Sequence, residues 1–169
     1  SDSILQYGFC FVASRVKSEK IAFLVNRGDI FINPGAFAVH GISVEQCKLN
    51  GLPEKDAVEM VYNTLADWRA GGGIFAGHNV MNFDAVRIAA DLKKYGHTLR
   101  FSADETIDTG MLVKASRLNM VPGPSEGLGN FYSRVNAVRA KGVYWSLDRY
   151  CFDAYDLGTK TGLSKEEAH

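Results

Sequence analysis

Residues 77–84, which read GHNVMNFD, are the stretch of this chain whose residue types best suit chemistry. The apolar segment 73–76 precedes them and predicts a buried strand. After them, apolar residues recur at helical spacing up to Gly96, which stands where a helix ends. Asp84 is therefore expected where a strand passes into a helix, at the sheet edge where α/β proteins bind ligands. Its carboxylate suits two roles, capping the helix or holding a divalent cation.

The string 77–84 also resembles a motif of a known family. It is similar to H-N-x-x-x-F-D, the second motif of the DnaQ-like (DEDDh) 3′–5′ exonucleases. Three further similarities follow in the family's order. Residues 33–43 resemble its P-x-x-x-x-x-H-G-I-T segment, residues 107–109 resemble its I-D-T segment, and residues 146–151 resemble the helix before its last motif.

The resemblance implies a fold and an activity. The fold would be α/β, the RNase H-like mixed sheet flanked by helices. The activity would be a metal-dependent 3′–5′ exonuclease acting on single-stranded 3′ ends of DNA or RNA, with two Mg²⁺ or Mn²⁺ ions about 3.5–4 Å apart. In the family, four acidic residues hold these ions and a histidine takes the proton from the attacking water. Asp84 matches one of the acids, and His169 matches the histidine. A histidine pKa near 6.5 suits a general base.

The same resemblance implies substrate contacts. His40 and Gly41 would lie beside the terminal nucleotide, because a glycine allows close approach of the backbone. Asn79 and Phe83 belong to the second motif and are expected to contact substrate as well. Phe83 is further expected to pack inward and fix the turn, so that Asp84 points into the crevice beyond the strand ends.

Two parts of the family pattern have no match. The first motif, D-x-E, would precede residues 2–8, and the last motif, H-x-x-x-x-D, would run beyond His169. The chain is thus expected to be one exonuclease-like domain, residues 1–169, without its first strand and last helix. Two other functions remain open: a catalytically inactive nucleic-acid-binding or scaffold domain with the same fold, and a hydrolase with a serine or cysteine nucleophile. The sequence has no G-x-S-x-G elbow for the latter.

Composition sets further bounds. The chain has 169 residues, 46% hydrophobic and 22% charged, with a formal net charge of zero, as in ordinary globular domains. The neutral charge gives no global basic signal, so a nuclease would need a local positive surface. Three dispersed cysteines predict no disulfide framework, and the histidines lack zinc spacing. No apolar run reaches membrane length, and no leader opens the chain, which predicts an intracellular, cytoplasmic location.

Periodicity predicts the elements that position these residues. Segments 4–13 and 21–25 are expected to form an antiparallel hairpin, and 30–35 a short strand ending in a turn. Ser43 and Gln46 predict a capping box. A helix is expected over 53–68, with Val58, Val61, Leu65 and Trp68 on one face and with Met60 and Tyr62 extending this face as core residues. A strand near 105–107 should run parallel to the strand ending near Gly77, and Asp108 is expected either to cap the following helix or to act directly.

Residues 119–142 are predicted to be a long irregular loop, because prolines and glycines interrupt them. Two readings of this loop are open. Arg134 and Arg139, with Lys141, would pair with phosphates while Phe131 and Tyr132 stack on bases, or the loop is merely solvated. A helix is expected next, over 145–155.

Overall fold

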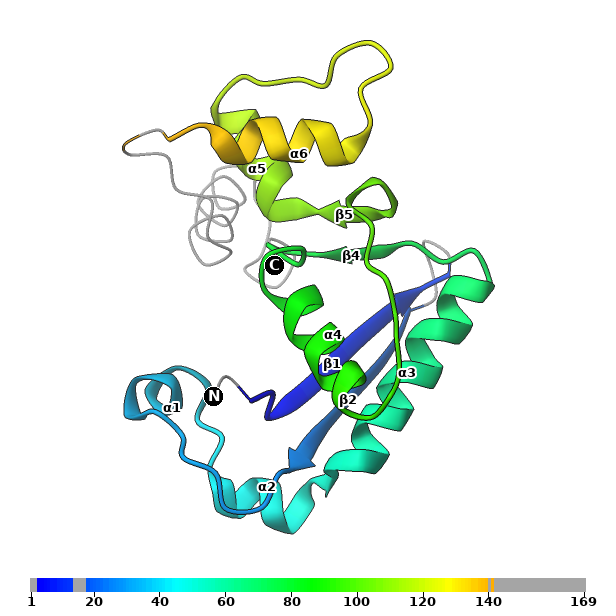
Figure 1. Cartoon of the computed structure of the whole chain (residues 1–169). Coiled ribbons are helices and arrows are strands. Elements are labelled where there is room, and N and C mark those ends of the chain that lie inside the picture. The colour runs from blue at the N-terminus through cyan, green and yellow to red at the C-terminus, as the bar shows by residue number, and fades with distance from the viewer. Residues whose placement is uncertain (1–2, 14–17, 140, 142–169) are drawn as a thin grey trace, which may run out of the picture. The chain divides into compact units, whose positions relative to one another are not determined.

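The computed structural model describes residues 3–13, 18–139 and 141. The fold is mixed α/β (Figure 1). The chain divides into two compact units, unit 1 formed by Ser1–Gly72 and Arg87–Leu99 and unit 2 formed by Gly73–Val86 and Arg100–His169. The expectation of a single domain stays a prediction. None of the described helices is long and apolar enough to cross a membrane.

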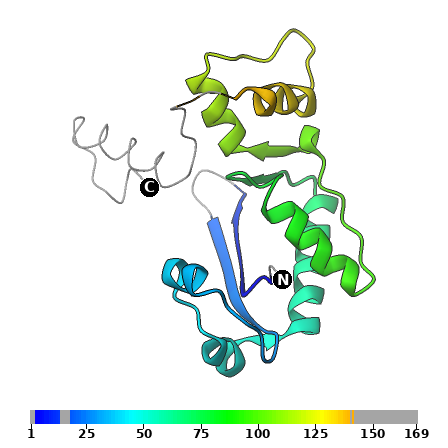
Figure 2. The same ribbon diagram turned by 60° about the vertical axis from the view of Figure 1, so that its left-hand side comes forward.

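Unit 1 contains a small mixed sheet. Strands β1 (Gln6–Val12) and β2 (Ser18–Asn26) are antiparallel, and β2 pairs in parallel with the two-residue strand β3 (Leu52–Pro53) (Figure 2). The predicted hairpin is thereby confirmed. The helices of this unit are α1 (Pro34–His40), α2 (Val44–Asn50), α3 (Glu54–Ala70) and most of α4 (Asp84–Lys94).

Helix α3 supplies much of the core of unit 1. Its buried residues Val58, Val61 and Leu65 recur every three or four positions, as predicted for one helix face. Met60 is 43% exposed, so its assignment to the core is wrong. It lies off the stripe that these three residues define. Tyr62 is partly buried and stacks on the His97 ring, 4.1 Å between centroids.

Caps explain the short helices. The predicted capping box of α2 is confirmed, since Ser43 and Gln46 each accept the other's backbone N–H, at 3.1 and 2.7 Å. The short strand predicted within residues 30–35 is wrong. These residues are irregular, and Asn33 caps α1 by accepting the Gly35 N–H at 2.8 Å, with Pro34 in the first turn.

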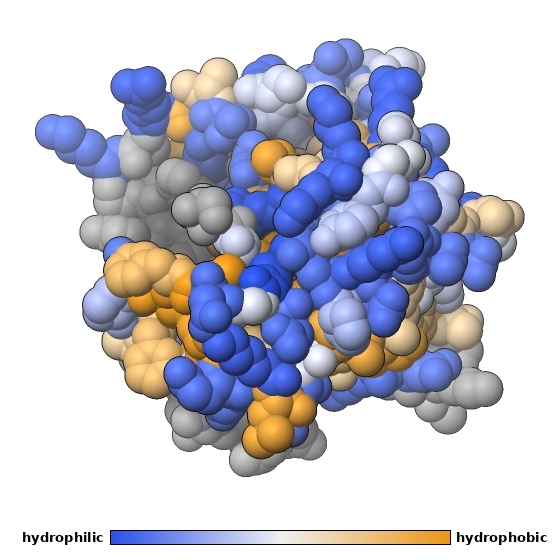
Figure 3. Space-filling model, turned by 60° about the horizontal axis from the view of Figure 1, so that its bottom comes forward, coloured by the Kyte–Doolittle hydropathy of each residue, from blue (hydrophilic) through white to orange (hydrophobic). Residues whose placement is uncertain are grey.

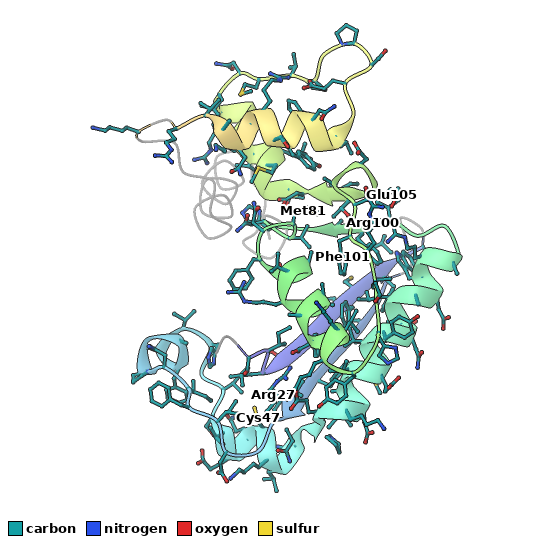
Figure 4. All side chains as sticks on the ribbon, viewed as in Figure 1. Arg27, Cys47, Met81, Arg100, Phe101 and Glu105 are labelled. Atoms are coloured by element: carbon teal, nitrogen blue, oxygen red, sulfur yellow. The ribbon has the colours of Figure 1, made fainter. Side chains whose placement is uncertain are left out.

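A buried arginine joins the elements of unit 1. The Arg27 side chain, 4% exposed, donates to the Ile4 carbonyl (2.6 Å), to Glu54 (2.7 Å) and to Asp91 (Figure 4). The Tyr7 hydroxyl donates to Asp91 at 2.6 Å. Burial and the bond to Asp91 raise the pKa of Tyr7. The network links the start of the hairpin to α3 and α4, and it pairs the buried guanidinium with two partly buried carboxylates.

Unit 2 contains a second, parallel pair of strands. Strand β4 (Phe75–Gly77) pairs with β5 (Thr106–Asp108), which confirms the predicted parallel arrangement (Figure 1). The short 3₁₀ helix η1 (Ala103–Glu105) precedes β5, and helices α5 (Thr109–Arg117) and α6 (Leu128–Ala137) follow it. The core between these helices is made of Met111, Ala115, Phe131, Tyr132 and Val135.

Helix α6 corrects the prediction of an irregular loop over 119–142. Leu128, Phe131, Tyr132 and Val135 follow helical spacing, and the glycines and prolines before them obscured this pattern. The helix predicted over 145–155 lies outside the described residues.

Candidate functional site

The candidate site lies at one edge of the β4–β5 pair. Gly77 and Asp108, the last residues of the two strands, are paired in register. Both strands are parallel, so the turn after β4 and the start of α5 emerge at the same edge. That turn, residues 78–83, leads directly into α4 at Asp84. The motif at 77–84 and the segment 107–109 therefore meet, as ligand-binding loops do in α/β sheets.

Internal hydrogen bonds shape the 78–83 turn. The Asn79 carbonyl accepts the N–H groups of Asn82 (3.2 Å) and Phe83 (3.1 Å), and the Val80 carbonyl accepts that of Ala85 (2.8 Å). Asn79 has a φ of 57°, a left-handed conformation that asparagine adopts more readily than most residues. These hydrogen bonds therefore give the turn a defined conformation up to the first residue of α4.

Two glycines allow the turn to pack closely. A Cβ atom on Gly77 would lie 2.9 Å from Val80 Cβ, and one on Gly110 would lie 2.9 Å from the Asn79 nitrogen. Neither distance is compatible with a real side chain. Val80, 8% exposed, packs against Gly77 in the space that the absent side chain leaves.

Asp108 connects the turn to helix α5. Its side chain is fully buried, and its Oδ1 accepts the N–H groups of Asn79 (2.9 Å), Gly110 (3.0 Å) and Met111 (3.2 Å). Its Oδ2 accepts the Met81 N–H at 3.2 Å. Of the two roles left open for Asp108, the cap of α5 is confirmed. The same carboxylate also holds two amides of the turn, which satisfies a charge that would be costly to bury alone.

Thr109 and Tyr132 complete this junction. Thr109 Oγ1 donates to the Gly77 carbonyl at 3.2 Å and lies 3.2 Å from His78 Nδ1. The Tyr132 hydroxyl accepts the Asp108 N–H (3.1 Å) and donates to the Thr106 carbonyl (3.3 Å). The ends of β4 and β5 are thus joined by side chains as well as by the strand ladder.

Asp84 and Phe83 stand at the outer side of the turn. Asp84 is the first residue of α4 and is exposed. Phe83 is 50% exposed, so the expectation that it packs inward is wrong. Val80 is the apolar anchor instead, because it faces the Cβ-free surface of Gly77. The Asn79 side chain accepts from Asn82 Nδ2 at 3.1 Å, which directs it along the turn.

His40 and Gly41 belong to unit 1 and end helix α1. His40 is exposed and its Nδ1 accepts the Ile42 N–H at 2.9 Å, while Gly41 has a φ of 67°. Large apolar side chains near them in the sequence are exposed: Phe31, Phe37, Val39 and Leu49. Figure 3 shows apolar side chains gathered at the left of the face that carries α1 and α2. Exposed apolar patches commonly mark binding surfaces.

The basic residues of the 119–142 segment have different surroundings. Arg134 lies on α6 and binds Glu126 through two hydrogen bonds (3.0 and 2.7 Å) and the Val121 carbonyl (2.8 Å). Arg139 is exposed beyond the end of α6. Phe131 and Tyr132 are buried, 2% and 6% exposed, so their expected stacking on bases is wrong. They form the core beneath α6.

The predicted catalytic histidine, His169, lies outside the described residues. Within residues 3–13, 18–139 and 141, no group of three or more histidine, cysteine or acidic side chains is arranged to hold a metal ion. The metal role of Asp84 therefore remains a prediction from the resemblance of residues 77–84 to the family motif.

Sequence reasoning missed the second function of Asp108. It offered the helix cap as one of two roles, but it did not predict the bonds to Asn79 and Met81. A signal was present, since two parallel strands ending at Gly77 and Asp108 must bring their following residues together. The roles of Val80 and Tyr132 carried no comparable signal.

Comparisons with known proteins add no assignment. No protein-family model matches the chain. A search of curated proteins found no significant match.

Proposed function

We propose that this chain is a DnaQ-like domain with an RNase H-like fold, and that its activity is metal-dependent 3′–5′ exonuclease cleavage of single-stranded DNA or RNA. One observation carries the proposal. The exposed carboxylate of Asp84 follows directly on a hydrogen-bonded turn at the carboxyl edge of two parallel strands. The motif that resembles the family's second motif therefore has a geometry suited to presenting a carboxylate to a ligand.

The described residues fit the implied metal in part. A carboxylate oxygen is the ligand type that Mg²⁺ and Mn²⁺ favour, and Asp84 is exposed. The described part of the chain supplies no cluster of three such ligands. The proposal therefore assigns Asp84 as one ligand of the family's two-metal site, whose ions would supply water activation and charge stabilisation when bound.

Other residues of the chain have proposed roles toward substrate. The half-exposed ring of Phe83 offers a stacking surface next to Asp84. His40 and Gly41 stand beside exposed apolar side chains, which suits contact with a nucleobase. Arg139 is a candidate for phosphate pairing, whereas Arg134 would first have to leave Glu126.

The test is substitution of Asp84. The substitution is made in a protein that carries this sequence together with whatever residues flank it naturally. In that protein, Asp84→Ala should abolish Mn²⁺-dependent trimming of a 5′-labelled single strand. The free energy of unfolding should fall by less than about 1 kcal/mol, the usual value of an acidic residue in a first helical turn. Asp56→Ala is the matched control, since Asp56 is an exposed aspartate in the first turn of α3. It should cost similar stability and leave trimming intact.

The alternative, a non-catalytic nucleic-acid-binding domain, predicts another result. That protein would bind the labelled strand without shortening it, and Asp84→Ala would change nothing in the products. Trimming by the Asp84→Ala protein at the parent rate would remove Asp84 from the site.

A further inference from the structure

The strongest unassigned feature is the junction between the segment 107–109 and the 78–83 turn. Asp108 and Thr109 reach across from the end of β5 to the backbone that follows β4. Neither side chain is required there by the strand ladder, which already ends at Gly77 and Asp108. Their contacts act on the turn that leads to Asp84.

We propose that Asp108 and Thr109 are positioning residues, which fix the backbone of the 78–83 turn and thereby the direction of the Asp84 carboxylate. The inference rests on the proposed function for its catalytic consequence, but the fixing of the turn is testable without it. Asp108 holds the turn at two amides, Asn79 and Met81, and Thr109 holds the carbonyl of Gly77 where the turn begins.

The two carboxylate oxygens of Asp108 contribute differently to the helix cap and to the turn. Oδ1 accepts the N–H groups of Gly110 and Met111 at the start of α5, together with that of Asn79. Oδ2 accepts the N–H of Met81 at 3.2 Å. A simple helix cap requires only one carboxylate oxygen. The second oxygen is therefore committed to the turn.

This division gives a selective variant. In Asp108→Asn, the side-chain oxygen can keep the three bonds of Oδ1, while its NH₂ group faces the Met81 N–H, donor against donor. The cap of α5 and the fold should persist. The contact to Met81 should be lost.

The first measurement is amide hydrogen exchange, read residue by residue by NMR without metal or substrate. In Asp108→Asn, exchange at Met81 should accelerate about tenfold, as expected for loss of a hydrogen bond to a charged acceptor. Exchange at Gly110 and Met111 should change little. Asp104→Asn is the matched control, because Asp104 also accepts a backbone N–H, from Gly129 at 2.8 Å, far from the turn in sequence.

The second measurement is steady-state trimming of a single strand with Mn²⁺. Asp108→Asn should lower kcat by about tenfold or more with little change in KM, since a displaced Asp84 affects the reacting groups and not the rest of the bound strand. Thr109→Val removes the hydroxyl that donates to Gly77 and should act in the same direction. Thr109→Ser keeps a hydroxyl at this position and should therefore retain most of the kcat of the parent.

The outcomes distinguish the two proposals. Unchanged exchange at Met81 in Asp108→Asn would overturn the positioning role. If exchange at Met81 is faster but kcat is unchanged, the turn does not set the direction of the Asp84 carboxylate. The exonuclease proposal is unaffected by that result. If the parent protein does not trim at all, the exonuclease proposal fails, and accelerated exchange at Met81 still supports the fixing of the turn.

Discussion

At the scale of single residues, the candidate site depends on close approaches of the backbone. Gly77 admits Val80, and Gly110 admits the nitrogen of Asn79. These contacts let one buried carboxylate serve both a helix start and a turn. Four backbone N–H groups of the turn and of α5 are therefore satisfied by the carboxylate of Asp108.

Gly110→Ala tests this packing. Alanine favours a helix over glycine by about 1 kcal/mol, but its Cβ would lie 2.9 Å from the Asn79 nitrogen, a backbone atom that cannot move aside cheaply. We expect steric repulsion to dominate and the free energy of unfolding to fall by about 1–3 kcal/mol. Urea unfolding followed by circular dichroism measures the change.

Gly123→Ala is the control for Gly110→Ala within unit 2. A Cβ on Gly123 would meet its nearest atom, Glu126 Oε2, at 3.7 Å, an ordinary contact. Its stability should stay close to that of the parent. If both variants are as stable as the parent, the backbone of the turn can move enough to accommodate a Cβ atom at position 110.

At the scale of elements, hydrogen bonds join helix α6 to the segment that precedes it. Arg134 binds Glu126 and the Val121 carbonyl, and Glu126 Oε2 also accepts the Gly123 N–H at 2.8 Å. The bonds from Arg134 and then from the Gly123 N–H lower the pKa of Glu126 from its ordinary value of 4.5 to about 2. The carboxylate thus links an irregular segment to the helix that carries the buried residues Phe131 and Tyr132.

The lowered pKa of Glu126 predicts a pH dependence. A carboxyl group whose pKa is lower in the folded state stabilises the fold fully above its unfolded pKa, and this contribution disappears as pH falls through the folded pKa. The stability difference between the parent and Arg134→Gln should therefore be constant above about pH 5 and shrink between pH 4.5 and about 2.

The direct readout is an NMR titration of the Glu126 carboxyl group. In Arg134→Gln its pKa should rise toward 4.5, because the largest cause of the shift is removed. Arg139→Gln is the control, since Arg139 follows α6 and is exposed. An unmoved pKa in Arg134→Gln would contradict the assigned pairing.

At the scale of the whole molecule, the chain forms two compact units with different sources of stability. Unit 1 combines the apolar face of α3 with the buried charges around Arg27. Unit 2 combines the core of α5 and α6 with the backbone bonds of Asp108. A substitution that removes contacts within one unit should therefore destabilise that unit first.

Arg27→Ala should be strongly destabilising. It leaves Asp91 and Glu54 without a buried guanidinium, which typically costs about 3–5 kcal/mol. Amide exchange should accelerate first in β1, β2 and α3, and less in β5 and α5. Lys93→Ala, at an exposed position of α4, should change neither stability nor exchange. Equal acceleration in both units would show that they unfold together.

The sequence by itself determined the elements that depend on local patterns. Examples are the hairpin of β1 and β2, the capping box of α2, and the buried face of α3. Alternation, capping pairs and helical spacing are properties of neighbouring residues. The same patterns predicted the strand, turn and helix around Asp84, and they offered the cap of α5 as one of two roles of Asp108. The expectation that segment 73–76 is buried is wrong, because Ile74 is 61% exposed and Ala76 is exposed. The RNase H-like assignment and the nuclease activity remain predictions from motif resemblance.

Only the tertiary structure decided which side chains meet. Asp108 reaches Asn79 and Met81, nearly thirty residues earlier in the chain, because two parallel strands end at the same edge. It likewise decided that Val80 anchors the turn while Phe83 is half exposed, since a glycine opposite one position makes room for it. Such contacts depend on which strands pair and on how side chains fit together in three dimensions. The order of residue types along one segment does not predict either of these.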